Sequence, residues 1–358
     1  MTTKIMQPKK KLSSSDKLLH DLWTLITEAR QDVARSVNSA LVLLYWKVGK
    51  RIRQEILKEK RAEYGEEIVP TLSARLVKDF GNGFSPPNLS RMVRLVEVFP
   101  DLTILSTLSK ELSWSHFVEI LPLKDDLQRD FYAEMCRIEK WSVRTLRGKI
   151  GSMLFERTAL SKKPDKLIRK ELSDLRKKDK LTPDLVFRDP YLLNFLGLKD
   201  TYGEKDLETA ILREMESFIL ELGVGFTFVA RQKRMTIGDD DFYLDLLFFH
   251  RKLHRLVAIE LKLDKFKPEY KGQMELYLRW LEKYEQQAGE FPPLGLILCA
   301  SKSEEQIELL QLGKSGIRVS AYWTEFPSRN LLRKKLHEAI ILARARLAEK
   351  KQLYLPGD

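Results

Sequence analysis

The sequence predicts an α+β protein of two domains: an all-α N-terminal domain with a helix-turn-helix-like element, then an α/β domain whose mixed sheet is flanked by helices. Two observations support this division. Over residues 17–157 the apolar side chains recur at helical spacing, as at Leu41, Tyr45 and Val48. From residue 226 onward, short runs rich in Val, Ile, Phe and Leu alternate with turns and further helical segments. The 358 residues are sufficient for about two hydrophobic cores.

The turn-forming string GNGFSPPN at residues 81–88 interrupts the helical pattern. We expect one helix to end at the glycine and a new helix to cover residues 87–99, with Ser85 as its N-cap and Pro86 at its first position. A helix, a short turn and a second helix with basic residues outline a helix-turn-helix, although an ordinary helical hairpin fits the same pattern. The second helix carries three candidate nucleic-acid contacts: Asn88, Arg91 and Arg94.

Changes in composition suggest the domain boundaries. Residues 17–160 form the expected helical domain. Residues 161–183 have dense mixed charge with leucines at helical spacing, which is typical of a solvated connector. Residues 184–328 form the second domain, and a charged helix over residues 329–350 closes the chain.

The hydrophobic period changes within the second domain. Its first helix, at residues 207–222, is amphipathic and is closed by Gly223. Three successive strands follow, and the remaining segments alternate between helix and strand, which gives the order α-β-β-β-α-β-α-β. The expected strands are residues 226–237, 242–250, 255–262, 294–300 and 317–322, and the later helices are residues 268–284 and 304–312.

The composition narrows the class of function. Lys and Arg number 63 against 51 Asp and Glu, a net charge of +12, which favours a polyanionic partner such as nucleic acid, although solvated basic faces are also common. Two cysteines and five scattered histidines support neither a disulfide framework nor a structural zinc site. No apolar run approaches the roughly 18 to 20 residues that cross a bilayer, so we expect a soluble, cytoplasmic protein without a membrane partner.

Two carboxylates lie inside apolar strands. Asp245 is flanked by leucines in YLDLLFFH, where a charged carboxylate is costly unless it is paired or bound to a cation. Glu260 and Lys262 lie two residues apart in RLVAIELKL, so they share one face of the next strand. A hairpin through residues 251–255 pairs the two strands. Both carboxylates can therefore converge on one point.

These groups match the ligands of a hard cation. The carboxylates of Asp245 and Glu260, the backbone carbonyl of Leu261 and water form the oxygen shell that Mg²⁺ or Mn²⁺ prefers. The Lys262 ammonium beside such an ion can orient or deprotonate an attacking water and neutralise charge during phosphodiester hydrolysis. A buried carboxylate that pairs with Lys262 or Arg231 for structural reasons fits the same residues.

Polar residues also occur just before these strands. Arg231 and Gln232, in VARQKRM, can hold a scissile phosphate or a base edge, or they can serve as solubility residues on an edge strand. The preceding helix carries further carboxylates, among them Glu208. Because so many acidic and basic groups accompany two apolar strands, we favour a catalytic site over a structural ion pair.

The chain resembles a known family. The strings DFYLDLLFFH, RLVAIELKLDKFKPEYKGQMELYL and PPLGLILCA are similar to the PD-(D/E)xK nuclease domain of bacterial YhcG-type proteins, and ALVLLYWKVGKRI, FGNGFSPPNLSRM and LSWSHFVEIL resemble the N-terminal domain that accompanies it. The resemblance covers nearly the whole chain. It implies a restriction-endonuclease-like fold in which Asp245, Glu260 and Lys262 form the core motif. It further implies Glu208 as the helix carboxylate and Gln273 as an accessory polar residue on the helix after the Glu260 strand.

These observations predict an endonuclease that requires Mg²⁺ or Mn²⁺ and cleaves DNA. Leu244 replaces the proline of the motif, at a position that bears no ligand. A non-catalytic nucleic-acid-binding or oligomeric scaffold that retains the fold is the alternative, and a junction-resolving or RNA-directed nuclease has the same sequence features. Because one such centre cuts one strand, we expect a homodimer or higher oligomer. The amphipathic segments 40–60 and 329–350 are candidate contacts, unless each packs within its own chain.

Overall fold

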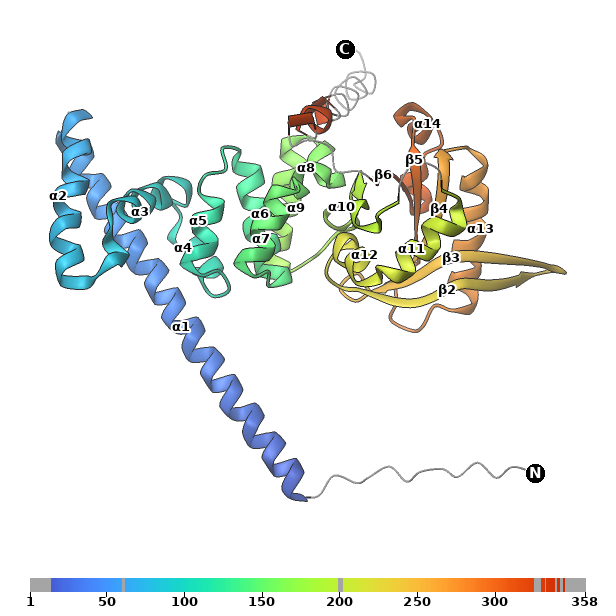
Figure 1. The fold of residues 1–358 in the computed structure, drawn as a ribbon, viewed down its shortest axis with the longest axis horizontal. Coiled ribbons are helices and arrows are strands. Elements are labelled where there is room, and N and C mark those ends of the chain that lie inside the picture. Colours follow the sequence, from blue (N-terminus) through green and yellow to red (C-terminus); the bar gives the residue numbers. More distant parts are fainter. Residues whose placement is uncertain are drawn as a thin grey trace, which may run out of the picture. The chain divides into compact units, whose positions relative to one another are not determined.

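A computed structural model describes residues 14–59, 62–198 and 202–324, together with residues 330–331, 333–338, 340–341 and 344 of the C-terminal segment. The chain divides into two compact units, Met1–Arg147 and Gly148–Asp358. The first unit is helical and the second is built around a sheet (Figure 1). The predicted order, helical region first and mixed sheet second, is confirmed.

The first unit is helical throughout its described elements. Its first helix, α1 (Ser14–Glu59), is 46 residues long, and the C-terminal half of α1 packs against the helices that follow. The following elements are α2 (Ala62–Phe80), η1 (Asn82–Phe84), α3 (Pro86–Val98), α4 (Leu102–Ser109), α5 (Trp114–Ile120), α6 (Asp126–Glu139) and α7 (Val143–Gly151), which crosses the division between the units.

Helices α1 and α3 approach each other closely at Gly49. A Cβ atom on Gly49 would lie 2.0 Å from the carbonyl oxygen of Met92, so a larger residue would force the backbones apart. Nearby, the indole N–H of Trp46 donates to the carbonyl of Phe99 at 2.9 Å. Segment 40–60, one predicted contact between copies, instead buries its main apolar side chains within its own unit: Val42, Tyr45, Trp46 and Ile52.

The turn before α3 has the predicted form. α2 ends at Phe80, and Gly81 follows with a φ of +87°, in the left-handed region that favours glycine. Ser85 occupies the N-cap position and Pro86 begins α3, although the Ser85 side chain makes no capping hydrogen bond. The sequence therefore located the start of this helix to within one residue.

The charged segment 161–183, predicted as a connector, lies within the second compact unit. Most of it forms α9 (Asp165–Lys178), which buries one apolar face. Lys163 pairs with Asp184, which also pairs with Arg318 of the last strand at 2.6 Å. These ion pairs join the segment to the sheet. The neighbouring short helices are α8 (Leu154–Arg157), η2 (Ala159–Lys162) and α10 (Pro183–Val186).

The sheet of the second unit has the strand order β1-β6-β5-β4-β3-β2. β2, β3 and β4 are antiparallel neighbours, whereas β4, β5, β6 and β1 are parallel neighbours, so the sheet is mixed as predicted. The β2–β3 hairpin extends beyond the other strands (Figure 1). The strands are β1 (Tyr191–Leu192), which was not predicted, β2 (Phe226–Ile237), β3 (Asp240–His250), β4 (Arg255–Lys265), β5 (Leu294–Ser301) and β6 (Ile317–Trp323).

One helix prediction was wrong. The helix expected over residues 207–222 is two helices, α11 (Glu204–Arg213) and α12 (Met215–Leu222), which meet at Glu214. The backbone of Glu214 leaves the helical region, with φ of −103° and ψ of 32°. The sequence hid this break because it contains no Gly or Pro there and its apolar residues stay in helical phase across it.

Helices cover both faces of the sheet. α13 (Glu269–Tyr284) packs in one apolar cluster with Leu247 of β3. Successive strand residues face opposite sides, and Phe248 meets the ring of Phe218 on α12, with centroids 6.1 Å apart. The remaining short elements are η3 (Asn194–Leu196), α14 (Glu304–Leu309) and η4 (Leu312–Ser315).

A buried ion cluster links the start of this unit to α12. Glu221 accepts hydrogen bonds from Arg157 at 2.5 Å, from Arg188 at 3.2 Å and from the backbone N–H of Leu192 at 2.9 Å. Arg157 is 0% exposed and Arg188 is 4% exposed. Burial alone would raise the pKa of Glu221, but the two guanidinium groups lower it below its ordinary value. The cluster therefore stabilises a charged carboxylate inside the unit.

The helix predicted over residues 329–350 is described only in part. Its described residues, between 330 and 344, are helical, and Leu336 is buried against Met153 and Trp323. The rest of this predicted contact segment lies outside the described residues. None of the helices in the described part of the chain is long and apolar enough to cross a membrane.

Candidate active site

The two strands that carry the predicted acidic residues separate at the candidate site. β3 pairs with β4 as far as Leu246 and Ile259. Beyond this point β3 continues along β2, and β4 continues along β5. Asp245 and Glu260 are the next residues on the two strands, so they lie at the fork. A longer β3–β4 ladder would have paired the backbone N–H and C=O groups at this point with each other. Because the strands separate, these groups can form hydrogen bonds with side chains instead.

Each carboxylate accepts a hydrogen bond from the backbone of the opposite strand. The N–H of Leu261 donates to Oδ2 of Asp245 at 2.9 Å, and the N–H of Asp245 donates to Oε1 of Glu260 at 3.3 Å. The ammonium of Lys262 lies 3.1 Å from Oε2 of Glu260. The structure thus brings together the acid, acid and lysine that the sequence grouped.

The pKa of each of these carboxyl groups is raised. Burial is the largest cause for Asp245, and the charge of Glu208 adds to it. Burial and then the charge of Asp245 raise the pKa of Glu260 to about 7. The charge of Lys262 lowers both pKa values, but this effect is smaller than the effects that raise them. The fork therefore holds more negative charge than its own residues neutralise, which favours a bound cation.

Lys262 remains an ammonium in this setting. Burial alone would lower its pKa, but Glu260, with smaller effects from Glu204 and Asp245, raises it overall. The Nζ atom also lies 5.3 Å from the centroid of the Tyr270 ring. A lysine with a raised pKa is suited to orienting water and to stabilising negative charge, and it is a weak proton acceptor.

Gln232 connects the helix carboxylate to the strand carboxylate. Its Nε2 donates to Oε2 of Glu208 at 3.0 Å and to Oδ1 of Asp245 at 3.1 Å. Its backbone has a φ of +43°, which is unusual for a non-glycine residue within a strand. Among the described residues, no three His, Cys, Asp or Glu side chains are arranged to hold a metal ion. The Gln232 amide is the contact that links Glu208 to Asp245 at the fork.

Gln273 and Tyr277 are four residues apart on α13 and therefore share a face of this helix. Nε2 of Gln273 donates to the Tyr277 hydroxyl at 2.7 Å, and this hydroxyl donates to the carbonyl of Tyr243 at 3.5 Å. Burial is the main cause that raises the pKa of Tyr277, and the charges of Glu260 and Asp245 add to it. Gln273 is thus bonded to a tyrosine close to the carboxylates.

The other residues predicted to contact nucleic acid lie on two elements. Arg231 is exposed on β2, the edge strand next to the fork. On α3, Arg91 donates to the side chain of Asn88 at 3.1 Å, and Arg94 pairs with Glu97 at 2.9 Å. Both α3 arginines are exposed, because the apolar residues of this helix occupy its opposite face.

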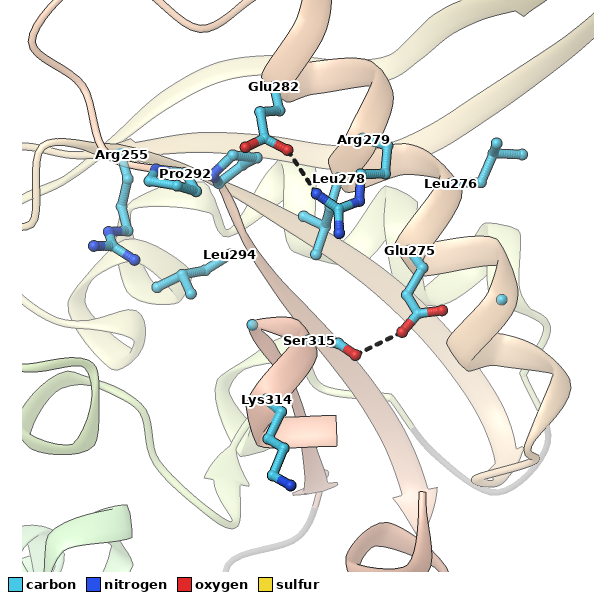
Figure 2. A pocket seen from close by; sticks show the side chains of 13 residues that line it. Arg255, Glu275, Leu276, Leu278, Arg279, Glu282, Pro292, Leu294, Lys314 and Ser315 are labelled. Carbon is cyan, nitrogen blue, oxygen red and sulfur yellow. Dashed lines mark hydrogen bonds and ion pairs between the residues drawn. The ribbon is translucent and has the colours of Figure 1, made fainter. Parts of the chain in front are cut away.

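A separate cavity of about 630 Å³ lies where β4 and β5 begin. Figure 2 shows two polar interactions at this cavity, between Ser315 and Glu275 at 2.6 Å and between Arg279 and Glu282 at 3.1 Å. None of the predicted catalytic residues lines it. The fork of β3 and β4, which lies at the middle of β4, therefore remains the candidate active site.

Sequence comparisons cover most of the chain. Residues 21–157 match the DUF1016 N-terminal domain, and residues 184–337 match the YhcG PDDEXK nuclease domain. The chain is 32% identical to the Escherichia coli (strain K12) protein described as "Putative nuclease YhcG", over 363 residues that cover 92% of this chain and 95% of that protein. The chain belongs to the YhcG family. This confirms the resemblance seen in the sequence motifs, and it assigns the PDDEXK domain of this family to the unit that holds the fork.

Solved structures give weaker likenesses. A repair endonuclease from Pyrococcus abyssi is 22% identical with a TM-score of 0.25, over 36% of this chain and 50% of that chain. A structure of an EndoMS complex with double-stranded DNA is 19% identical with a TM-score of 0.27, over 36% of this chain and 49% of that chain. Each match spans about half of the solved chain. The assignment to the YhcG family depends on the sequence comparisons.

Proposed function

We propose that this YhcG-family chain is a Mg²⁺-dependent endonuclease that hydrolyses phosphodiester bonds in DNA. The supporting observation is the fork of β3 and β4, where Asp245 and Glu260 lie together with raised pKa values beside the Lys262 ammonium. If these residues formed only a structural ion pair, their charges would balance and the pKa values of the carboxyl groups would not both be raised. The match of residues 184–337 to a nuclease domain supports the same chemistry.

The donor set of the fork fits Mg²⁺ or Mn²⁺. Asp245 and Glu260 offer carboxylate oxygens. The N–H and C=O of one strand residue face the same neighbouring strand, so the Leu261 carbonyl should point into the fork as its N–H does. Mg²⁺ commonly binds one or two carboxylates and retains several waters. When bound, such an ion lowers the pKa of a coordinated water and stabilises charge on a phosphate oxygen.

The remaining site residues act around these ligands. Lys262 orients the attacking water and neutralises the charge that develops on the phosphate, because its raised pKa keeps it protonated. Glu208 positions Asp245 through the Gln232 amide or supports a second ion. Gln273 fixes the Tyr277 hydroxyl next to the carboxylates.

Nucleic acid binding uses both units in this proposal. Arg231 on the edge strand contacts a backbone phosphate beside the fork, and Gln232 lies next to it along the chain. In the first unit, α3 serves as the second helix of a helix-turn-helix, with Asn88, Arg91 and Arg94 facing DNA. Reversal of both arginines to Glu should weaken duplex binding and reduce its salt dependence, because each phosphate contact contributes a slope of about 0.9.

The decisive experiment compares substrates and ions. The purified full chain is incubated with single-stranded, duplex and branched DNA and with RNA, each with Mg²⁺, Mn²⁺ or EDTA. Cleavage of duplex DNA with either ion, and none with EDTA, supports the proposal. Binding without cleavage of any substrate would favour the alternative of a non-catalytic scaffold that retains the nuclease fold. Cleavage restricted to RNA or to branched DNA would replace the proposed substrate.

We also expect a homodimer or higher oligomer that acts in the cytoplasm. One centre of this type cuts one strand, and closed two-fold symmetry is the commonest way for a protein to supply a second centre. The two cysteines are both free, which fits a reducing compartment. Light scattering on the full chain tests the assembly, and a purely monomeric chain would leave a nicking enzyme.

A further inference from the structure

We propose that Gln232 is a metal-responsive residue of the fork: its amide N–H groups bind Glu208 and Asp245 before a cation arrives, and its amide oxygen becomes a ligand afterwards. This inference rests on the proposed function, since it requires that the fork bind a divalent cation. It concerns a residue that neither the family match nor the acid, acid, lysine pattern assigns to the metal.

The chemistry of the contacts defines the orientation of the amide. The same nitrogen of Gln232 lies 3.0 Å from Glu208 and 3.1 Å from Asp245, so both of its N–H groups donate to carboxylates. The opposite orientation would place the amide oxygen against two carboxylate oxygens. A cation between these groups reverses that preference, because it attracts oxygen and repels the N–H groups. The terminal torsion of Gln is nearly two-fold, so a half-turn exchanges the two atoms without moving the backbone.

The backbone of Gln232 supports a specific role. The ladder between β2 and β3 pairs Arg231 with Leu246 and Lys233 with Leu244, and Gln232 lies between them with a φ of +43°. A left-handed residue in a strand costs free energy and persists only where its surroundings fix it. Here the bonds to Glu208 and Asp245 hold the side chain in place. A residue that served only solubility on an edge strand would not need this conformation.

Calorimetry of Mn²⁺ binding to the full chain, without nucleic acid, tests the proposal. Gln232→Leu removes both the amide donors and the amide oxygen, and it should weaken Mn²⁺ binding about tenfold or more. Gln232→Asn tolerates the left-handed backbone but is one carbon shorter, so it should also bind more weakly. Gln232→Glu places a second oxygen at the same point and should bind Mn²⁺ at least as tightly as the native chain. Gln287→Leu, the same change at an exposed residue after α13, is the matched control.

The outcomes separate this inference from the function on which it rests. If the native chain binds no Mn²⁺, both fail. If the native chain binds Mn²⁺ and Gln232→Leu binds it equally tightly or more tightly, then the amide is only a placeholder that the ion displaces, and the inference about Gln232 alone is overturned. Circular dichroism verifies that each variant is folded. Weaker binding by a folded Gln232→Leu, with an unchanged Gln287→Leu, supports the inference.

A second inference concerns the N-terminal half of α1. We infer that this segment pairs antiparallel with the same segment of a second copy of the chain. Nearly all described side chains between residues 22 and 38 are exposed, including large apolar ones. Four of these form a stripe, with the exposed fractions Leu22 47%, Ile26 54%, Val33 64% and Val37 62%.

The spacing of this stripe indicates the partner. Ile26 follows Leu22 by four residues, Val33 follows Ile26 by seven, and Val37 follows Val33 by four. The spacing is therefore the same when it is read from either end. At 3.6 residues per turn the four positions lie within about 60° on one face. An antiparallel two-fold pair therefore places Leu22 opposite Val37 and Ile26 opposite Val33. An isologous interface requires such self-complementarity, whereas a partner within the same chain does not.

The available area also suits a dimer. Trp23 and Leu25 flank the stripe and are 69% and 61% exposed. If each of these six side chains buries on the order of 100 Å², which is about half the area of a large aromatic side chain, they offer about 600 Å² per copy. Two copies reach about 1,200 Å², the lower end for a specific interface. A concentration-dependent dimer is therefore expected.

Light scattering over a wide range of concentration tests this pairing. The native chain should reach twice its mass of 41.9 kDa. A double substitution, Ile26→Lys with Val33→Lys, should remain monomeric, because it places charge at the centre of the stripe. Glu28→Lys changes the net charge equally on the opposite face of the helix and should dimerise as the native chain does. A native chain that stays monomeric, or a double variant that dimerises normally, overturns the inference, and the stripe is then covered in some other way.

Cysteine cross-linking tests the direction of the pairing. Ala29 lies next to the expected two-fold axis. In the Ala29→Cys variant, the new cysteine should therefore form a disulfide with the same cysteine of the second copy. Leu22→Cys should not, because in an antiparallel pair its counterpart lies about 22 Å away along the helix. Equal cross-linking of both variants indicates a parallel pair and overturns the antiparallel arrangement. The native cysteines, Cys136 and Cys299, are buried and do not compete.

Discussion

Two clusters of buried charge in the second unit differ in the balance of their charges. At α12, the single carboxylate of Glu221 accepts from Arg157 and Arg188. At the fork, Asp245 and Glu260 share the ammonium of Lys262, with the Glu208 carboxylate close by. Burial acts in the same direction on all of these carboxyl groups, yet the pKa of Glu221 is lowered while those of Asp245 and Glu260 are raised.

The difference separates a structural cluster from a functional one. Two guanidinium groups around one carboxylate more than balance its negative charge, so this carboxylate needs no further cation. The second cluster has an excess of carboxylates, which destabilises the fold unless a cation binds. A buried ion pair is therefore weak evidence for function by itself. The sign of the remaining charge distinguishes the two cases.

The largest expected effect is on activity. Asp245→Asn should reduce Mg²⁺-dependent cleavage by at least about 1000-fold, since even one electrostatic contact to the reaction centre contributes about 10²–10³. The same variant should keep or increase the stability of the metal-free protein, because it removes one of the crowded charges. Cleavage assays and urea unfolding measure the two effects. Undiminished cleavage in purified variant protein would refute the assignment of Asp245.

The same chemical change at the other cluster should act oppositely on stability. Glu221→Gln leaves Arg157 and Arg188 buried without a carboxylate, which we expect to cost about 3–5 kcal/mol of unfolding free energy. Urea unfolding of the two amide variants side by side measures the contrast. Equal loss of stability in Asp245→Asn and Glu221→Gln would show that the clusters do not differ as described.

Lys262→Ala should have an intermediate effect. We expect about a 10- to 100-fold loss of cleavage rate at saturating Mg²⁺ and a smaller change in Mn²⁺ affinity, because Lys262 acts on water and phosphate and is not itself a metal ligand. Single-turnover kinetics and calorimetry separate the two quantities. If rate and affinity fall by the same factor, Lys262 instead positions Glu260.

The smallest expected effect is the pH dependence of the metal-free protein. The folded pKa of Glu260, about 7, is above its ordinary 4.5, so this group contributes stability below 4.5 that is lost as pH rises through 7. The pKa of Glu221 is lowered, so its contribution is present above the ordinary value and is lost on further acidification. Unfolding free energy should rise by about 1–3 kcal/mol from pH 8 to about 5.5, and it should fall only below about 4.5, where the Glu221 contribution is lost.

Glu260→Gln is the control for this pH dependence. It should reduce the gain between pH 8 and 5.5 to the part that Asp245 contributes, and it should preserve the loss at lower pH, since the Glu221 cluster is unchanged. Saturating Mg²⁺ should also remove the gain in the native chain, because a bound cation keeps both carboxylates charged. A gain of undiminished size in Glu260→Gln would assign it to another group.

The site was predictable where it depended on local pattern. Asp245, Glu260 and Lys262 were found because charge inside apolar strands is rare, and strand alternation determines which residues share a face. The contacts of Gln232 were not predictable, because they depend on a left-handed backbone at one position of β2 and on the register with β3. The ion pair between Arg157 and Glu221 was also missed, since these two residues are 64 positions apart in the chain.

The same distinction applies to the fold. The sequence by itself determined the periods of its helices and strands, the turn at Gly81 and the mixed character of the sheet, because these follow from side-chain spacing and backbone preferences. It could not predict the two-residue strand β1, which exists because it pairs with β6, or the break at Glu214, where the apolar pattern continues.

Only the tertiary structure decided which buried charges are compensated. The sequence supplied acidic and basic residues to both clusters in similar apolar surroundings. Their pKa values diverged because folding brought two guanidinium groups to Glu221 and left Asp245 and Glu260 beside one ammonium at the point where β3 and β4 separate. Electrostatic energy depends on distances between groups that are remote in the chain, and the order of residues does not contain those distances.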